Sequence, residues 1–141
     1  MSTRRPVAFL IDTSVWGRKH QAIVARRLLS LATADEMRTC RAVDLEVVYS
    51  VRSREVERDA WRRRLLLDVP ITPDIMNRSL DVAIEMAAAG LHRHAKPMDL
   101  IIAAAAEAAD LVVLHYDRDF DHIASVTDQS TEWVAPPGSL D

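Results

Sequence analysis

The chain has 141 residues, a formal net charge of −3, 49% hydrophobic residues and 28% charged residues. This composition excludes a disordered chain, and the length predicts a single domain over residues 1–141. The lone cysteine, Cys40, excludes an internal disulfide, and no apolar stretch reaches the roughly 20 residues that a membrane-spanning helix needs. We therefore expect a cytoplasmic protein with no membrane partner.

The first half of the chain alternates strand and helix patterns. Residues 7–11 form an apolar run typical of a strand buried on both faces of a parallel sheet, and Asp12 follows it directly. The apolar spacing predicts a helix over residues 21–34, and a short strand over residues 38–41 should follow. The next helix, capped by Asp44 or a neighbour, carries Glu46 in its first turns.

The middle of the chain continues the alternation. Residues 54–67 have the charge pattern of an exposed helix and lead into a short strand over residues 67–71. Proline is accepted at the first position of a helix, so Pro73 predicts a helix start, and Gly90 predicts its end.

The last part brings two more acidic positions. Pro97 opens an apolar helix that carries Asp99 in its first turn, and the run "LVVLHYD" predicts a second buried strand that ends in Asp117. A helix over residues 120–125 and an edge strand in "TEWVA" complete the pattern. Strands that alternate with helices predict an α/β fold with a mainly parallel sheet and right-handed crossovers.

Acidic residues stand where the predicted strands end. In an open parallel sheet ligands bind beyond the carboxyl ends of the strands, so Asp12 and Asp117 should share one edge, where helix starts can add Asp99 and Glu46. Two carboxylates 4 Å apart repel by about 4 kcal/mol at an effective dielectric of 20. Such a cluster requires protons or a cation, and its oxygen ligands favour Mg²⁺ or Mn²⁺ over zinc. The Ser14 hydroxyl is placed to support the cluster as a hydrogen-bond donor.

Each acid also has a purely structural explanation. Asp12 can cap the turn that follows it, and Asp99 can favour the positive end of its helix. Glu46 can pair with Arg41 or with an arginine of the next helix. For Asp12 alone or Asp99 alone, the structural explanation and a role in a shared site are equally good. Two buried strands that both end in aspartate favour the shared site.

Other chemistries lack their residues. Three glycines, none clustered, exclude a phosphate-binding loop, and there is no G-x-S-x-G motif. Cys40 has no evident base partner, and the histidines match no zinc spacing. A haloacid-dehalogenase-type phosphatase needs a second aspartate at the position that Ser14 occupies.

Four blocks, "LIDTSVW", "DLEVVYSVRS", "KPMDLIIAAAA" and "LVVLHYDRDFDHIA", together resemble the PIN-domain ribonucleases, specifically the VapC-type toxins of bacterial toxin–antitoxin pairs. The resemblance spans nearly the whole chain. It implies a three-layer α/β/α sandwich with a mainly parallel sheet of four to five strands. The choice of Glu46 over the nearby Asp44 rests on the "VVYS" that follows Glu46.

The resemblance also implies a function and a set of site residues. The protein would be the toxin of a type II toxin–antitoxin system and a divalent-metal-dependent endoribonuclease that hydrolyses RNA phosphodiesters with Mg²⁺ or Mn²⁺. Its partners would be RNA, a VapB-type antitoxin near the acids and a second copy in a homodimer. The implied catalytic acids are Asp12, Glu46, Asp99 and Asp117, with Asp12, Asp99 and Asp117 as metal ligands and Ser14 and Asp119 as auxiliary residues.

Two further expectations come from the residues themselves. Arginine suits phosphate partners, and Arg18, Arg52 and Arg118 are candidates to hold the flanking RNA backbone. The alternative function is a receiver-like regulatory module that holds Mg²⁺ without cleaving. Such a module wants adjacent acids after the first strand, whereas here Asp12 is followed by two hydroxyl residues.

Overall fold

The computed structural model describes the backbone of residues 7–140 and all of their side chains except those of residues 60–63. Within this range five strands form one sheet in which every neighbouring pair is parallel, in the order β3-β2-β1-β4-β5. The strands are β1 (Phe9–Ile11), β2 (Met37–Thr39), β3 (Leu67–Asp68), β4 (Val112–His115) and β5 (Thr131–Trp133). The predicted α/β fold with a parallel sheet of four to five strands is confirmed.

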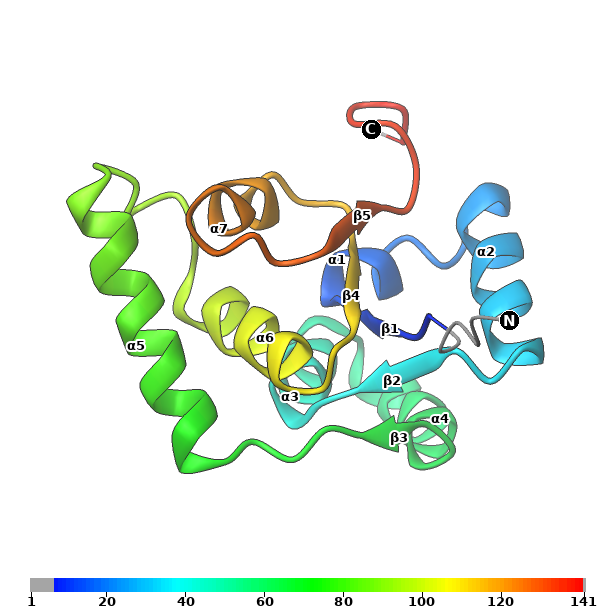
Figure 1. Ribbon diagram of the computed structural model, residues 1–141. Helices are drawn as coiled ribbons and strands as arrows, with labels where there is room; N and C mark the ends of the chain where they lie inside the picture. The colour runs from blue at the N-terminus through cyan, green and yellow to red at the C-terminus, as the bar shows by residue number, and fades with distance from the viewer. Residues whose placement is uncertain (1–6, 141) are drawn as a thin grey trace, which may run out of the picture.

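Helices cover the sheet on two sides. Figure 1 shows α2 on one side of the strands and α6 on the other, with α5 packed outside α6. The chain crosses the sheet in one direction from β1 to β3 and in the opposite direction from β3 to β5. Because right-handed crossovers in opposite directions place their helices on opposite faces, both faces of the sheet are covered. The helices are α1 (Thr13–Trp16), α2 (Ala22–Thr33), α3 (Arg41–Ser50), α4 (Ser53–Arg64), α5 (Pro73–Ala88), α6 (Pro97–Ala108) and α7 (Asp119–Thr127).

Several sequence-based boundaries differ from the structure, and three of the differences lie near the acidic residues. A four-residue helix, α1, follows Asp12 at once, and the apolar periodicity of so short a segment gives no signal. Helix α3 begins at Arg41 after an N-cap at Cys40, so Asp44 lies inside the first turn and is not the cap. The strand expected at residues 38–41 lies at Met37–Thr39, because the chain is already helical at Arg41.

The centre of the sheet is the driest part of the core. Leu10, Ile11, Val113 and Leu114 have no exposed surface, as expected for neighbouring parallel strands covered on both faces. Helix α6 turns a run of buried alanines, residues 103–106, toward this core, and small side chains let a helix lie close to a sheet. These residues belong to one continuous hydrophobic cluster.

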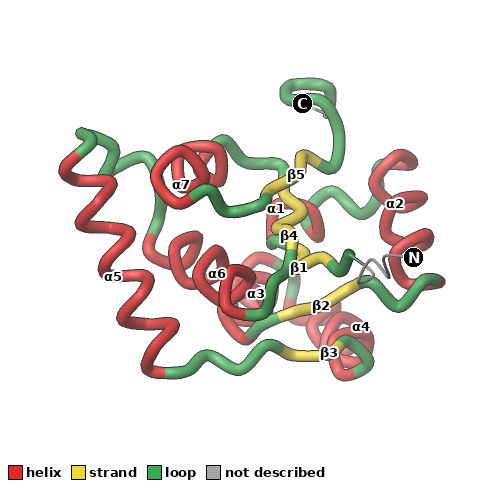
Figure 2. The backbone as a smooth tube through the Cα atoms, in the orientation of Figure 1, coloured by secondary structure: helices red, strands yellow, loops and turns green. Residues whose placement is uncertain are grey.

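Strands β1 and β4 mark the point where the strand order reverses. After β1 the chain moves toward β2 and β3, whereas after β4 it moves toward β5 on the opposite edge (Figure 2). The connections that leave these two adjacent strands therefore diverge. A ligand-binding crevice is expected at this position in an open α/β sheet.

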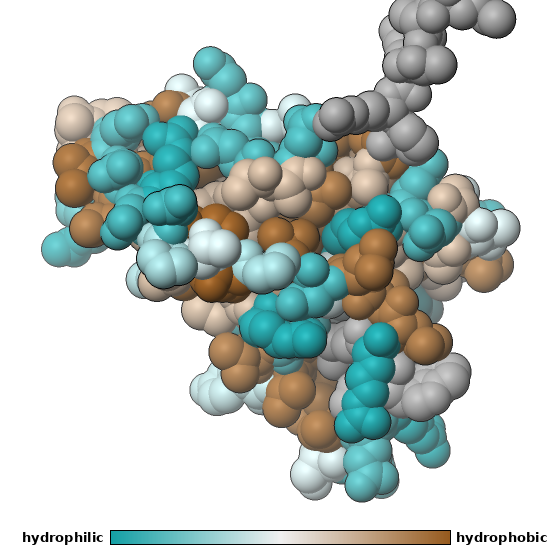
Figure 3. Space-filling view, turned by 60° about the horizontal axis from the view of Figure 1, so that its bottom comes forward, coloured by the Kyte–Doolittle hydropathy of each residue, from teal (hydrophilic) through white to brown (hydrophobic). Residues whose placement is uncertain are grey.

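The surface carries scattered apolar side chains. Figure 3 shows apolar groups separated by polar ones, including a group over α5, where Met76, Leu80 and Ile84 are exposed. None of the helices in residues 7–140 has the length and apolar character to cross a membrane.

Candidate metal centre

Three carboxylates from three elements meet beyond the end of β1. One ligand oxygen of each of Asp12, Glu46 and Asp99 lies within 4.8 Å of the other two. Asp12 directly follows β1, Glu46 lies in α3, and Asp99 lies in the first turn of α6. Asp12 and Asp99 are buried and Glu46 is half-buried. We call these three residues the inner group.

A second set of three carboxylates shares one member with the first. Ligand oxygens of Asp99, Asp117 and Asp119 also lie within 4.8 Å of one another. Asp117 follows β4, and Asp119 is the first residue of α7. Both are half-buried, so this outer group lies nearer to solvent than the inner group. The structure thus brings all five predicted acidic residues to the switch point of the sheet.

The Asp12 carboxylate has one satisfied and one unsatisfied oxygen. Its Oδ2 accepts hydrogen bonds from the Ser14 amide at 3.0 Å and from the Ser14 hydroxyl at 2.5 Å. Asp12 is therefore the N-cap of α1, as the structural explanation proposed. Its Oδ1 is buried and has no hydrogen-bond partner among the described residues. An unpartnered buried carboxylate oxygen fits a cation ligand, because burial without a partner is costly.

Burial and nearby carboxylates raise the pKa values of the two aspartates of the inner group. Burial raises the pKa of Asp12 to about 6, against the effect of the Ser14 hydrogen bonds, and the nearby charge of Glu46 adds to the rise. Burial also raises the pKa of Asp99 to about 8, with further contributions from the Asp119 carboxyl and the charge of Asp12. Asp99 therefore holds a proton near neutral pH, and Asp12 holds one below about pH 6, unless a cation takes the place of the proton, which fits a divalent metal ion held by oxygen ligands.

Hydroxyl groups after β1 tie the acids to their surroundings. The Ser14 Oγ atom, besides donating to Asp12, accepts a hydrogen bond of 2.9 Å from the Tyr116 amide and so links the exits of β1 and β4. The Thr13 hydroxyl donates to Glu46 Oε1 at 3.0 Å. Thr13 is a residue that sequence reasoning did not single out, and the "DTS" motif was the only signal for it.

The exit of β4 is shaped by a buried histidine. The ring of His115 packs against Phe120 and Trp133, and its Nδ1 accepts a hydrogen bond of 3.2 Å from the Asp117 amide. Burial lowers the pKa of His115 to about 4, so the ring is neutral at physiological pH. The Asp117 carboxylate in turn accepts a hydrogen bond of 2.9 Å from the Asp119 amide. His115 is a packing residue that fixes the Asp117 backbone.

Lys96 lies against the outer group. Its Nζ atom is 3.3 Å from Asp119 Oδ2, 3.7 Å from Asp117 Oδ2 and 3.9 Å from Asp99 Oδ2. Its backbone amide also donates to Asp99 Oδ2 at 3.3 Å. Sequence reasoning did not place this lysine in the site. The sequence feature that could have indicated Lys96 is its position three residues before Asp99, at the N-cap of α6.

The structure separates Glu46 from Asp44. Asp44 accepts hydrogen bonds of 2.7 Å from both the Thr39 hydroxyl and Arg41, away from the inner group. Arg41 thus pairs with Asp44, and Glu46 contacts Thr13, so the expected alternative of a Glu46–Arg41 pair is wrong.

The three candidate RNA-binding arginines occupy different settings. Arg18 donates to the Ser14 carbonyl at 2.9 Å and its guanidinium lies 4.3 Å from the centre of the Tyr116 ring. Arg52 is exposed between α3 and α4, and Arg118 is exposed between Asp117 and Asp119. The proposed RNA-binding role of all three stays a prediction.

Comparison with known sequences gives the family. The PIN-domain family pattern matches residues 9–126. Ribonuclease VapC18 of Mycobacterium tuberculosis is 41% identical over 138 residues, which cover 95% of this chain and 100% of the relative. Ribonuclease VapC21 of the same organism is 40% identical over 141 residues, 99% of each chain. The chain belongs to the PIN-domain family and is similar along its whole length to VapC ribonucleases.

Solved structures share the fold at low sequence identity. DNA-bound VapBC from Salmonella typhimurium superposes with a TM-score of 0.71 at 19% identity, covering 92% of this chain and 100% of the other. A toxin–antitoxin complex from Klebsiella pneumoniae superposes with a TM-score of 0.67, also at 19% identity, covering 80% and 90% of the two chains. The expected PIN-like fold is confirmed.

Proposed function

We propose that this protein is the toxin of a VapBC-type toxin–antitoxin pair and that it cleaves RNA with a divalent metal ion at the cluster of Asp12, Glu46, Asp99, Asp117 and Asp119. The observation that carries the proposal is the buried, unpartnered Asp12 Oδ1 in a group of three acids at the switch point of the sheet. The sequence similarity to ribonucleases VapC18 and VapC21 supports the choice of RNA as substrate.

The residues divide the work of the site. A divalent ion would be held by Asp12 and Asp99, which lie with Glu46 in the inner group, and Asp117 is the further predicted ligand, at the exit of β4. A divalent ion bound there lowers the pKa of a water molecule and stabilises the charge of the departing oxygen. Ser14 keeps the Asp12 carboxylate oriented through its 2.5 Å hydrogen bond, and Asp119 supports Asp117. Mg²⁺ is our first choice and Mn²⁺ the second, because all ligands are carboxylate oxygens.

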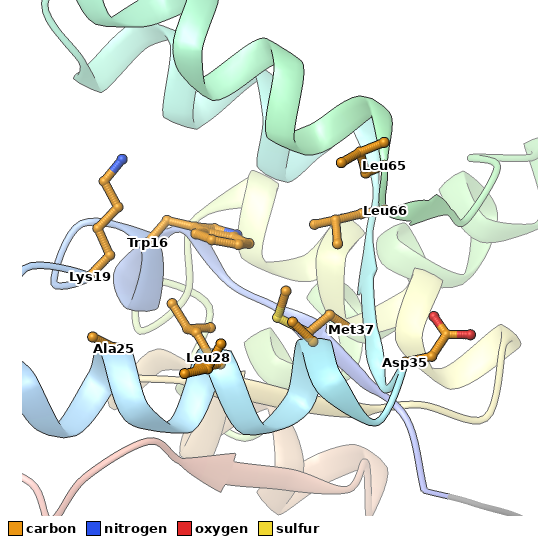
Figure 4. Close-up of a pocket in the computed structure, with 10 residues that line it drawn as sticks. Trp16, Lys19, Ala25, Leu28, Asp35, Met37, Leu65 and Leu66 are labelled. Atoms are coloured by element: carbon orange, nitrogen blue, oxygen red, sulfur yellow. The ribbon is translucent and has the colours of Figure 1, made fainter.

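A VapB-type antitoxin is the proposed protein partner. One surface suited to such a partner is an apolar pocket of about 500 Å³ between α2 and the end of α4. Figure 4 shows Trp16 and Leu66 pointing into it from opposite sides, above Leu28 and Met37. Trp16 belongs to α1, the helix that Asp12 caps. The homodimer implied by the family stays a prediction.

The test is RNA cleavage by the purified protein. We expect cleavage in Mg²⁺ or Mn²⁺ that stops on chelation and returns when the ion is restored. Asp12→Asn should stop cleavage in the same buffer. A protein that binds Mg²⁺ but cleaves no cellular RNA would instead support the receiver-like regulatory module.

A further inference from the structure

We infer that Lys96 supplies the second positive charge of the site, in the place where a second metal ion would otherwise bind, so that the protein takes one divalent ion. This inference rests on the proposed function, because it concerns how the same acids share their charge. It assigns a positioning role to a residue of this chain and decides between one bound ion and two.

The geometry of the ammonium group is that of an ion held by the outer group. Its Nζ atom lies 3.3 to 3.9 Å from one oxygen of each of Asp99, Asp117 and Asp119, the same three residues that would ligate a metal there. Lys96 lies at the N-cap of α6, and the hydrogen bond from its backbone amide to Asp99 fixes the start of the side chain. The lysine therefore reaches all three acids from a defined position.

The two members of the inner group that the outer group does not share, Asp12 and Glu46, lack such a cation. Among the side chains that the structure describes, residues 7–59 and 64–140, no ion pair includes Asp12 or Glu46, and Asp12 Oδ1 has no hydrogen-bond partner. A first divalent ion is expected to enter this group, where the negative charge is uncompensated and the site is more buried. Asp99 belongs to both groups, so an ion bound in the inner group withdraws charge from the outer one.

The Lys96 ammonium group then halves the remaining charge of the outer group, from two negative charges to one. Asp117 and Asp119 face the Lys96 ammonium group, and the inner ion lies on the other side of Asp99. A second divalent ion would have to displace the ammonium group and approach the first ion at short range. Both effects weaken its binding. The lysine side chain is 68% exposed, so its removal leaves the core intact.

The experiment counts bound Mn²⁺ by electron paramagnetic resonance of the free ion. We expect the wild type and Lys96→Arg to saturate at one equivalent and Lys96→Met to saturate at two. Arg93→Met is the matched control, because it removes the same charge from an exposed position three residues earlier in the same loop. It should saturate at one equivalent. Circular dichroism in metal-free buffer checks that each variant is folded.

The outcomes separate this inference from the proposed function. Two equivalents in the wild type, or one in Lys96→Met, would overturn the role of Lys96 while RNA cleavage by the wild type still supports the nuclease. A wild type that binds no Mn²⁺ and cleaves no RNA would overturn both. A second equivalent of Mn²⁺ bound by Arg93→Met would show that the net charge of the protein, not the position of Lys96, sets the number of ions, and would also contradict the inference.

Discussion

The two halves of the acidic site differ in how their charge is compensated. The inner group is the more buried half, and Asp12 keeps an unpartnered oxygen there. The outer group is half-exposed and holds the Lys96 ammonium group within 4 Å of three carboxylates. Five acids at one sheet edge therefore do not form one uniform cluster. Asp12 and Glu46, which have no cation beside them among the described side chains, mark the half that requires a metal ion.

This difference also separates two kinds of supporting residue. Around the inner group the support is a set of hydroxyls, Ser14 and Thr13, which hold the acids in place without cancelling their charge. Around the outer group the support is ionic. Hydroxyl support leaves the carboxylates free to ligate a cation, and ionic support lowers the demand for one.

The largest expected effect follows from breaking the inner group. Asp12→Asn or Asp99→Asn should lower RNA cleavage by more than about 100-fold, because an amide is a poor ligand for a hard cation and loss of a ligand costs at least as much as loss of its supporting partner. Single-turnover cleavage rates of a defined RNA measure this. Asp44→Asn is the matched control, because Asp44 is bonded to Thr39 and Arg41 outside the site. Equal losses in all three variants would contradict the assignment.

The next effect is a pH dependence of stability in the absence of metal. The pKa of Asp12 in the folded state is about 6, above the ordinary 3.8, so the folded state holds the proton more tightly than the unfolded state does. The contribution of Asp12 to the free energy of unfolding is therefore full below about pH 4 and is lost as the pH rises through 6. At 1.36 kcal/mol for each pKa unit, this loss is about 3 kcal/mol. Asp99, with a pKa of about 8, extends the loss to higher pH.

Denaturant unfolding of the chelated protein at pH 4, 6 and 8 measures this loss. Asp12→Asn should flatten the profile between pH 4 and 6, and added Mg²⁺ should restore the wild-type stability at pH 8. A wild-type profile that rises over this range relative to Asp12→Asn would contradict the description of the inner group.

A smaller effect is expected from the hydroxyl support. Ser14→Ala removes the bond to Asp12 Oδ2 and the bond from the Tyr116 amide, and should cost about 1.5 to 3 kcal/mol of unfolding free energy. Cleavage should fall by about 10- to 100-fold, as for other residues that orient a ligand. Ser125→Ala, which removes an exposed hydroxyl that donates to the His122 carbonyl at 2.6 Å, is the control for loss of a serine. Equal cleavage rates for Ser14→Ala and the wild type would show that the Ser14 hydroxyl is not needed to orient the Asp12 carboxylate.

The smallest effect concerns the exposed rim of the outer group. Arg118→Ala should weaken RNA binding and lower the slope of log K against log salt by about 1, if Arg118 contacts one phosphate. The exposed Arg26 on α2 offers a control, and Arg26→Ala should leave the slope unchanged. Binding of an uncleavable RNA in Ca²⁺ at several salt concentrations gives the slopes. Identical slopes for Arg118→Ala and the wild type would show that Arg118 does not contact an RNA phosphate.

Sequence reasoning located the acids that follow strands because strand ends are readable. An apolar run that stops at an aspartate places Asp12 and Asp117 at one edge of a parallel sheet, and the structure agrees. Helix α1 escaped prediction because four residues carry no usable periodicity. Strand β3 is also shorter than expected, two residues instead of five, since it pairs with β2 alone at the edge of the sheet.

The contact between Lys96 and Asp119 could not be read from spacing. The two residues are 23 positions apart, and their contact depends on the start of α6 meeting the start of α7 beside β4. The choice of Glu46 over Asp44 rested on the "VVYS" motif, because both acids lie in α3 and their partners, Thr13 for Glu46 and Thr39 for Asp44, come from other elements.

The most direct test of the inner group is a crystal structure of the wild type soaked in Mn²⁺, with the ion located by its anomalous scattering. We predict one strong peak at ligand distance, about 2 Å, from oxygens of Asp12 and Asp99. A peak that lies only beside Asp119, or no peak near any of the five acids, would contradict the claim that the inner group is the metal site.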